Sequence, residues 1–496
     1  QAQHDQHDHH GMGKRGVTRM PMSMGDMDGQ MSAEDRQHML HQHHRQTLWI
    51  PFTVMLLGIW LMTSPAVLGY GNNVSPDARL VTLERDLWPT QLRASLMIWN
   101  DIISGALLVV LGFLWLRLSL VWAPWIACFV GIWLLFAPLV LWSPSAAAYQ
   151  NDNLVGILVI ALTILIPGMP GMILVMKMGP EVPPGWTYNP SSWLQRLPVI
   201  ALGFVGLFAS RHLAAYQLGY IPHAWDPFFG AGTQRILESD VSRAWPISDA
   251  GLGVVAYTLE ALMGFMGSPA RWRTMPWMVL FFGILVVPLG LVSIALVIMQ
   301  PVAVGTWCTI CLFTALAMLI MIPLTLDEVV AMLQFMVRGH RAGKPFWSTF
   351  WKGGADEGGG KDERSPEITA PPAKSSPAMV WGVTVPWNLM LSALIGMWLM
   401  AAPDVLGTQG SAGNSNHLVG ATIVVVSVIC MAEVARAGRF LNLALGAWTV
   451  VAPWVLAGAS DVALWSSVLS GLAVMVLSLP RGPMRERYGG WDRYVF

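Results

Sequence analysis

Charged residues and cysteines are both scarce in this chain. Asp, Glu, Lys and Arg make up 12% of its 496 residues, and only four cysteines occur. Soluble domains carry roughly twice that share of charge, so the composition excludes an ordinary soluble protein. Lys plus Arg balance Asp plus Glu at 29 each, and this zero net charge excludes a bulk attraction to nucleic acid.

Apolar residues are abundant instead, at 54% of the chain. Apolar runs of about 20 residues recur along it, and each is long enough to cross a bilayer as a helix. These runs predict an all-α polytopic membrane protein with about twelve spans, at about 48–68, 96–118, 121–141, 153–176, 195–218, 249–267, 276–299, 303–323, 386–402, 416–436, 440–457 and 461–479.

The loops between these runs predict an orientation. Most Lys and Arg residues, such as Arg271, Arg338 and Arg436, fall on the face that carries both termini, and basic loops stay in the cytoplasm. We therefore expect an integral protein of a bacterial inner membrane, surrounded by membrane lipid, with cytoplasmic N- and C-termini. The external face then holds Cys308 and Cys311, in a compartment where disulfides persist.

A short motif, G-x-W-x4-P, occurs four times, as "GIWLMTSP", "GIWLLFAP", "GMWLMAAP" and "GAWTVVAP", at Gly58–Pro65, Gly131–Pro138, Gly396–Pro403 and Gly446–Pro453. The helix after each copy begins with small polar residues and a glycine, as in "NDIISG" and "NDNLVG". Glycine permits close helix packing in lipid and Trp anchors a helix near the interface. The motif indicates packed helix pairs or, alternatively, a ligand-lined cleft around the Pro turns. The copies resemble the SPW-repeat membrane family, which implies little chemistry.

The repeats and composition changes predict six segments. They are a His/Met-rich cytoplasmic tail at 1–45, a first SPW-like block at 46–180, a four-helix bundle at 186–337, a Gly-, Pro- and charge-rich linker at 338–380, a second SPW-like block at 381–480 and a cytoplasmic tail at 481–496. His38, His41 and His44 in the first tail fall at one-turn spacing. Imidazole and Met favour copper, so this tail is either a copper site or a disordered polar segment.

Two cysteines form the motif "WCTIC" at the start of an apolar run, as Cys308 and Cys311. This spacing places both sulfurs on the first helical turn, within bonding reach, and unpaired N–H groups at a helix start stabilise a thiolate. The pair is a redox centre, half of a metal site, or two small core residues. A zinc site needs two more ligands, and the nearby external loop offers only His223 and acids. Cys128 and Cys430 lie alone in mid-helix and indicate packing.

The bundle resembles the vitamin K epoxide reductase family in the order of its elements. The match rests on "GTQRILESDVSRAW" from Gly232, "LGVVAYTLEALMG" from Leu252 and "WCTICLFTA" from Trp307. The resemblance implies that the CxxC pair passes two electrons to a membrane quinone and becomes a disulfide. It also implies that a second cysteine pair, on the external loop, relays electrons from a partner thiol protein.

Three positions depart from the family pattern. The relay cysteines fall at Phe229 and Leu237, and no cysteine occurs between Pro222 and Ser248. A tyrosine that contacts the quinone in the family falls at Ala315. A partner thiol therefore reduces the CxxC pair directly, or the bundle has left the disulfide pathway.

Further quinone-site candidates lie in the same bundle. Asp249 falls where the family has an Asn that bonds a quinone carbonyl, and Tyr257 lies two turns further along. A protonated Asp249 could donate to that carbonyl, or the residue could simply cap its helix. Glu260, inside a predicted span, is either a proton carrier or a structural group. His212 is a possible proton donor or a metal or haem ligand.

The sequence thus predicts a membrane thiol–disulfide oxidoreductase that links the catalytic pair Cys308 and Cys311 to a quinone. Two alternatives remain open. One is a redox-silent membrane scaffold or accessory subunit, favoured by the missing relay cysteines. The other is copper handling through the His/Met-rich tail.

Overall fold

The computed structural model describes residues 41–495 except 43, 118, 166–178 and 357. These residues form helices joined by loops, and their β pairing is limited to three isolated bridges. Ten of their helices are long and apolar enough to cross a membrane, which confirms the polytopic all-α class. Two further long helices, α12 and α21, have 17 and 15 residues; a count of twelve spans therefore stays a prediction.

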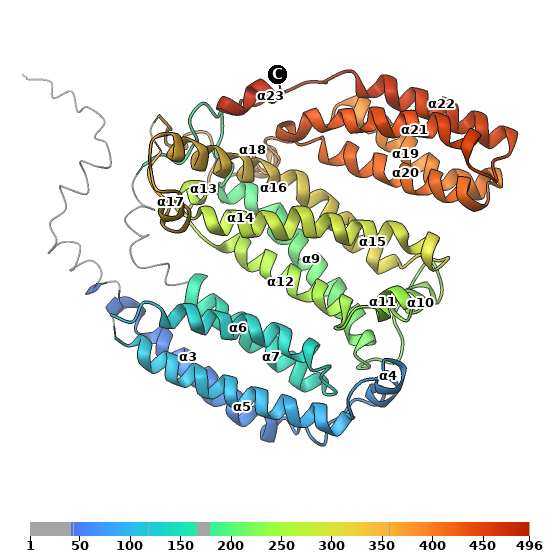
Figure 1. Ribbon diagram of the computed structural model, residues 1–496. Helices are drawn as coiled ribbons and strands as arrows, with labels where there is room; N and C mark the ends of the chain where they lie inside the picture. Colours follow the sequence, from blue (N-terminus) through green and yellow to red (C-terminus); the bar gives the residue numbers. More distant parts are fainter. Residues whose placement is uncertain (1–40, 43, 118, 166–178, 357, 496) are drawn as a thin grey trace, which may run out of the picture.

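The long helices gather in three groups that follow one another along the chain (Figure 1). The first block contains α3 (Trp49–Val67), α5 (Thr90–Trp115), α6 (Ala123–Val140) and α7 (Ala146–Ile160), which continues as the π-turn η1 (Ala161–Leu165). The central bundle contains α9 (Trp193–Gln217), α12 (Asp249–Phe265), α14 (Pro276–Ile284), η2 (Leu285–Leu289), α15 (Gly290–Ala303) and α16 (Thr309–Arg341). The second block contains α19 (Trp387–Leu406), α20 (Gly410–Ile429), α21 (Leu441–Val455) and α22 (Asp461–Ser478).

Glycines of the repeat bring each helix pair into backbone contact. A Cβ added to Gly58 would lie 2.6 Å from the carbonyl oxygen of Gly105, and one added to Gly105 would lie 2.5 Å from that of Gly58. The same reciprocal contact joins Gly131 to Gly156, Gly396 to Gly420 and Gly446 to Gly471. No side chain fits at these crossings, so the motif supports helix packing as expected for small residues in lipid.

The tryptophans of the repeat do more than anchor a helix at the interface. Trp60 of α3 donates its indole N–H to Asn151 of α7, and Trp133 of α6 donates to Asn100 of α5, each at 2.8 Å. In the second block, Trp398 donates to Ser466 and Trp448 to Ser415, each at 3.0 Å. Each indole thus crosses to the other helix pair, because an N–H group in hydrocarbon needs an acceptor.

The last helix of the bundle runs well beyond its predicted end. Hydropathy predicted a span at 303–323, but α16 continues to Arg341. Its polar residues Asp327 and Glu328 are buried with partners: Tyr188 donates to Asp327 at 2.7 Å, and Arg271 bonds Glu328 at 2.6 Å. These partners offset the cost of burying the two carboxyl groups. The helix can therefore continue through the polar positions where the hydropathy pattern ended the span.

The segment expected as a linker packs onto its neighbours. It contains α17 (Phe346–Lys352) and α18 (Pro372–Ala378). Arg364 makes a two-bond ion pair with Glu486 of the C-terminal segment, at 2.6 and 2.7 Å, and Gly360 forms a β-bridge with Val182. These contacts lie at the end of the protein where α13 (Arg271–Thr274) and α23 (Asp492–Val495) also gather (Figure 1).

The opposite end carries the loop that leads to the candidate site. This loop, between α9 and α12, contains α10 (Gly232–Leu237) and α11 (Asp240–Arg243), and α4 (Ala78–Glu84) of the first block lies at the same end. Both α10 and α11 precede α12 in the chain and lie over the end of the central bundle where α16 begins (Figure 1).

Candidate redox site

The CxxC pair sits at the first turn of α16. Cys308 is the N-cap residue, and its sulfur accepts a hydrogen bond from the backbone N–H of Cys311 at 3.1 Å. The two cysteines form a disulfide, with their Cα atoms 5.2 Å apart. Cys308 is 0% exposed and Cys311 is 8% exposed. Cys308 is therefore fully buried, and Cys311 keeps a small exposed area.

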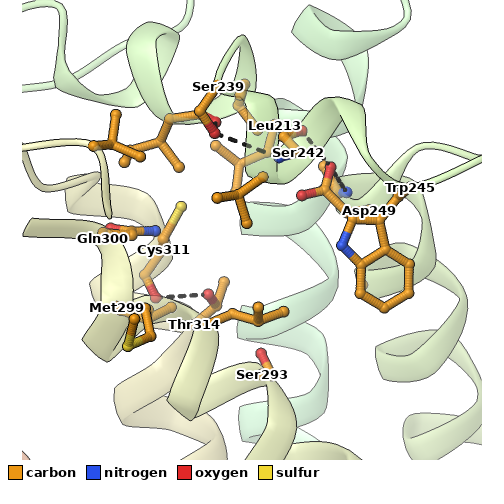
Figure 2. Close-up of a pocket in the computed structure, with 18 of the residues that line it drawn as sticks. Leu213, Ser239, Ser242, Trp245, Asp249, Ser293, Met299, Gln300, Cys311 and Thr314 are labelled. Atoms are coloured by element: carbon orange, nitrogen blue, oxygen red, sulfur yellow. Dashed lines mark hydrogen bonds between the residues drawn. The ribbon is translucent and has the colours of Figure 1, made fainter. Parts of the chain in front are cut away.

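A cavity of about 160 Å³ lies beside this pair, which is space for far more than one water molecule. Its walls come from α9, α10, α11, α12, α15 and α16. Cys311 lines it and Cys308 does not. Figure 2 shows Cys311 and Gln300 on one side of the cavity and Asp249 with Trp245 on the other. The disulfide thus presents one sulfur to a partly open, largely apolar space that a carboxyl group also lines.

Asp249 is held by residues of three elements. Its Oδ1 accepts hydrogen bonds from the Gln217 side chain, from Ser242 at 3.0 Å and from the N–H of Ala250 at 3.0 Å. The helix cap is Ser248, which accepts from the N–H of Gly251 at 2.9 Å, so the alternative of Asp249 as the cap is wrong. All three donors meet Oδ1, which leaves Oδ2 as the oxygen that can meet a ligand.

The other predicted quinone contacts divide into two groups. Tyr257 lines the cavity, and its hydroxyl donates to the carbonyl of Thr314 at 2.8 Å. Ala315, Glu260 and His212 are not among its lining residues. Glu260 is buried with neither carboxyl oxygen hydrogen-bonded within the described part of the chain. His212 instead accepts from the N–H of Trp225 at 3.0 Å and so holds the loop between α9 and α12.

Both positions of the missing relay cysteines carry apolar side chains. Phe229 is 38% exposed on the loop, whereas Leu237 is buried and lines the cavity. A side chain that cannot exchange electrons therefore stands at the inner relay position.

Polar residues that the sequence analysis did not select fix the CxxC turn. The side-chain oxygen of Gln300 on α15 accepts the N–H of Cys308 at 3.1 Å. Trp307 packs its ring against His417 of α20, with centroids 5.3 Å apart, and His417 donates to the carbonyl of Ile298 at 2.9 Å. A polar residue near the end of an apolar span is a signal that could have indicated Gln300.

Asp226 ties the loop between α9 and α12 to the start of α16. Its carboxylate accepts from the N–H groups of Phe229 at 2.9 Å and Thr233 at 3.0 Å, and from the hydroxyls of Thr233 and Thr309. Burial alone would raise the pKa of Asp226, but these hydrogen bonds together lower it below its ordinary value. The Asp-Pro pair in "WDPFFG" was the available sequence signal for such a loop-fixing carboxylate.

Replacing Asp226 by alanine is expected to open this loop. The loss of hydrogen bonds to a charged group, about 1–3 kcal/mol, raises the reactivity of the reduced cysteines toward a membrane-impermeant thiol reagent by about tenfold or more. Because the folded-state pKa is lowered, the loop is stabilised above the unfolded value of about 4 and loosens as pH falls below it. The protection that the loop gives, measured as the labelling rate divided by that of the unfolded protein at the same pH, is therefore constant from pH 8 to 5. Asp240→Ala, at an exposed carboxylate of α11, is the control; equal labelling of both variants would contradict this role.

The predicted copper ligands are only partly within the described residues. His38 lies outside them. His41 is exposed, and His44 makes a hydrogen bond to the carbonyl of Leu116 at 3.1 Å. Among the described residues, no group of three or more His, Cys, Asp or Glu is placed to hold a metal ion. Copper binding by the tail remains a prediction.

The fold and the site define a helical membrane protein with a CxxC pair at the start of a bundle helix, beside a partly open cavity. Residues 197–326 match the vitamin K epoxide reductase family, and residues 386–480 match the SPW repeat domain. The chain therefore carries a vitamin K epoxide reductase family domain next to an SPW repeat domain. That family comprises membrane redox enzymes associated with quinones. No curated protein and no solved structure matches the chain significantly.

Proposed function

We propose that Cys308 and Cys311 form the redox centre of a membrane thiol–disulfide oxidoreductase, which transfers electrons between this pair and a quinone bound in the adjacent cavity. The observation that carries the proposal is the position of Cys311. It is the cysteine that lines the cavity, while its bonded partner Cys308 is fully buried behind it.

The chemistry requires two electrons and two protons. The reduced pair loses two thiol hydrogens and forms the Cys308–Cys311 disulfide, and the quinone gains two electrons and two protons to become the hydroquinone. Cys311 would face the quinone ring. Asp249 is a polar group at the opposite wall, where its protonated form would donate a hydrogen bond from Oδ2 to one quinone oxygen. The family tyrosine is replaced by the buried Ala315, which offers no hydrogen bond.

Reduction of the disulfide is the step that the family's two loop cysteines would assist, and this chain has Phe229 and Leu237 at those positions. We propose that an external thiol protein reaches Cys308 directly after the loop held by Asp226 moves aside. The second candidate is a redox-silent scaffold. It is favoured by one observation, that Leu237 occupies the inner relay position and lines the cavity.

Thiol trapping on native membranes tests the proposal. Membranes are treated with a mild reductant, incubated with or without added quinone, and labelled with a mass-shifting thiol reagent under denaturing conditions. Quinone is expected to convert Cys308 and Cys311 from labelled thiols to an unlabelled disulfide. Cys128 and Cys430, both free and buried, are the internal reference. Full labelling of both cysteines with and without quinone would exclude the redox function and favour the redox-silent scaffold.

Substitution of Asp249 is expected to separate a ligand contact from a structural one. Asp249→Asn keeps a polar group at the cavity wall and retains quinone affinity. Asp249→Ala leaves a quinone oxygen unpaired, at a cost of about 1–3 kcal/mol, or about tenfold or more in Kd. Affinity is measured by titration of the purified protein, with Asp240→Ala as the control. The same affinity in all four proteins would count against a quinone at this wall.

We also propose that both termini lie in the cytoplasm of a bacterial cell and that the CxxC end faces outward. Basic residues concentrate at the end occupied by α13, α17 and the C-terminal segment, where Arg271, Arg273, Arg338 and Arg485 lie, and such residues favour the cytoplasm. A reporter fused to the C-terminus is expected to read as cytoplasmic. An external signal would reverse the assignment and place the disulfide in a reducing compartment.

A further inference from the structure

Two aspartates lie buried together inside the first block, far along the chain from the cysteines. Asp101 of α5 and Asp152 of α7 are both 0% exposed. The amide nitrogen of Asn100 lies 3.1 Å from Oδ1 of Asp101 and 3.3 Å from Oδ2 of Asp152, so the two carboxyl groups flank one amide group. Such a carboxyl pair avoids like-charge repulsion when one member holds a proton. We propose that Asp101 and Asp152 bind one proton between them and make the first block a proton-binding element within the membrane.

The surrounding polar groups show which member is ionised. Asp101 accepts hydrogen bonds from the Tyr70 hydroxyl at 2.8 Å, from the Asn100 amide at 3.1 Å and from the Ser64 hydroxyl at 3.4 Å. Three donors stabilise a carboxylate. Asp152 accepts only the long bond from Asn100, at 3.3 Å to Oδ2, and its Oδ1 has no partner within the described residues. Asp152, which has fewer donors, is therefore the member that carries the proton.

The same shell disfavours a metal cation. The carbonyl oxygens of Asn100 and Asn151 are taken by the indole N–H groups of Trp133 and Trp60. Each amide therefore turns its N–H₂ group inward, and Asn151 donates to Ser64 and Tyr70, each at 3.0 Å. A cation needs inward-facing lone pairs, whereas these side chains present hydrogens. A proton on a carboxyl oxygen satisfies that arrangement.

Within the described ranges, no cationic side chain makes a hydrogen bond or an ion pair with either aspartate. α3 and α6 contribute no Asp, Glu, Lys, Arg or His. The titratable neighbours are tyrosines: Tyr70, Tyr149 of α7 and, from the end of α9, Tyr220. Arg93, on the same helix as Asp101, donates to the carbonyls of Trp88 and Trp142. Two unprotonated carboxylates would thus stand side by side without a counter-charge, which is too costly within a bilayer.

The second block provides an internal comparison. Its tryptophan bonds occupy the same motif positions, so that Asn416 corresponds to Asp101 and Ser467 to Asp152. Asn416 donates to Ser467 at 3.0 Å, and both are buried. A neutral pair therefore meets the packing needs of this fold. The two carboxyl groups of the first block are not required by the architecture, and a bound proton is what distinguishes that block from its copy.

The double variant Asp101→Asn with Asp152→Ser places in the first block the same Asn and Ser that the second block has at the corresponding positions, Asn416 and Ser467. Infrared spectra of the full-length protein in lipid vesicles report the carbonyl stretch of protonated carboxyl groups. We expect the native protein at neutral pH to show a carboxylic-acid band that the double variant has lost, so that it appears in the difference between the two spectra. Glu260→Gln, at another buried carboxyl, is expected to leave this difference band in place and serves as the control.

Two results would overturn the proposal. One is the same carboxylic-acid band in the native protein and the double variant, which would mean that both aspartates are ionised. The other is loss of the band on addition of Na⁺ or K⁺ at constant pH, which would make the site a cation site. If the double variant does not fold, Asp152→Asn replaces it. That variant keeps a hydrogen-bond donor at this position, and it must lose the same band, because Asp101 remains ionised.

Discussion

Replacing Cys311 by serine is expected to abolish quinone-linked turnover. Two-electron transfer through a disulfide has no substitute once one sulfur is missing, so the rate falls to background, a loss on the order of 10³-fold or more. The measurement is quinone reduction by reduced protein in vesicles. Because Cys311 lines the cavity and Cys308 does not, quinone affinity changes more with Cys311→Ser than with Cys308→Ser.

Cys128→Ser is the matched control, since Cys128 is also a buried membrane cysteine but is free. It is expected to retain the native rate. If Cys311→Ser reduced quinone as fast as the native protein does, electrons would be taking another route and the redox assignment would fail.

Removing the carboxylate of Glu328 is expected to destabilise the central bundle strongly. Glu328 and Arg271 form a two-bond ion pair, at 2.6 and 2.7 Å, with side-chain exposures of 5% and 1%. Glu328→Ala leaves the buried guanidinium without its counter-charge, at a cost of about 3–5 kcal/mol. The measurement is the free energy of unfolding in mixed detergent micelles.

The double variant Arg271→Met with Glu328→Met separates charge from packing. It removes both charges while keeping apolar volume, so it is expected to be clearly less destabilised than Glu328→Ala. Equal losses in the two proteins would mean that the buried ion pair does not account for the effect.

Hydropathy was sufficient for the architecture because lipid demands long apolar helices. It predicted every long helix to within a few residues at most ends, and the repeated glycines indicated which helices touch. It failed at α16, since the pairing of Asp327 and Glu328 comes from Tyr188 and Arg271, which are distant in sequence. It also missed the packing of Arg364 onto Glu486, because a Gly- and charge-rich composition does not reveal a specific partner.

The candidate site was predictable where it rested on a local motif. The CxxC spacing was enough to predict Cys308 and Cys311 as a pair. The family resemblance indicated Asp249 and Tyr257, which line the cavity. Gln300 and Asp226 act on the CxxC turn from other elements, and no local pattern connects them to it. Contacts of this kind depend on how helices are arranged in space.

The contact between His417 and the turn before Cys308 connects the redox site to the thickness of the membrane. His417 of the second block packs on Trp307, next to Cys308, and donates to the carbonyl of Ile298 on α15. Helices tilt when their apolar length and the hydrocarbon thickness differ, and a tilt of α20 would carry His417 with it. We therefore expect the thiol reactivities of this protein to depend on lipid chain length, so they are best compared between bilayers of equal thickness.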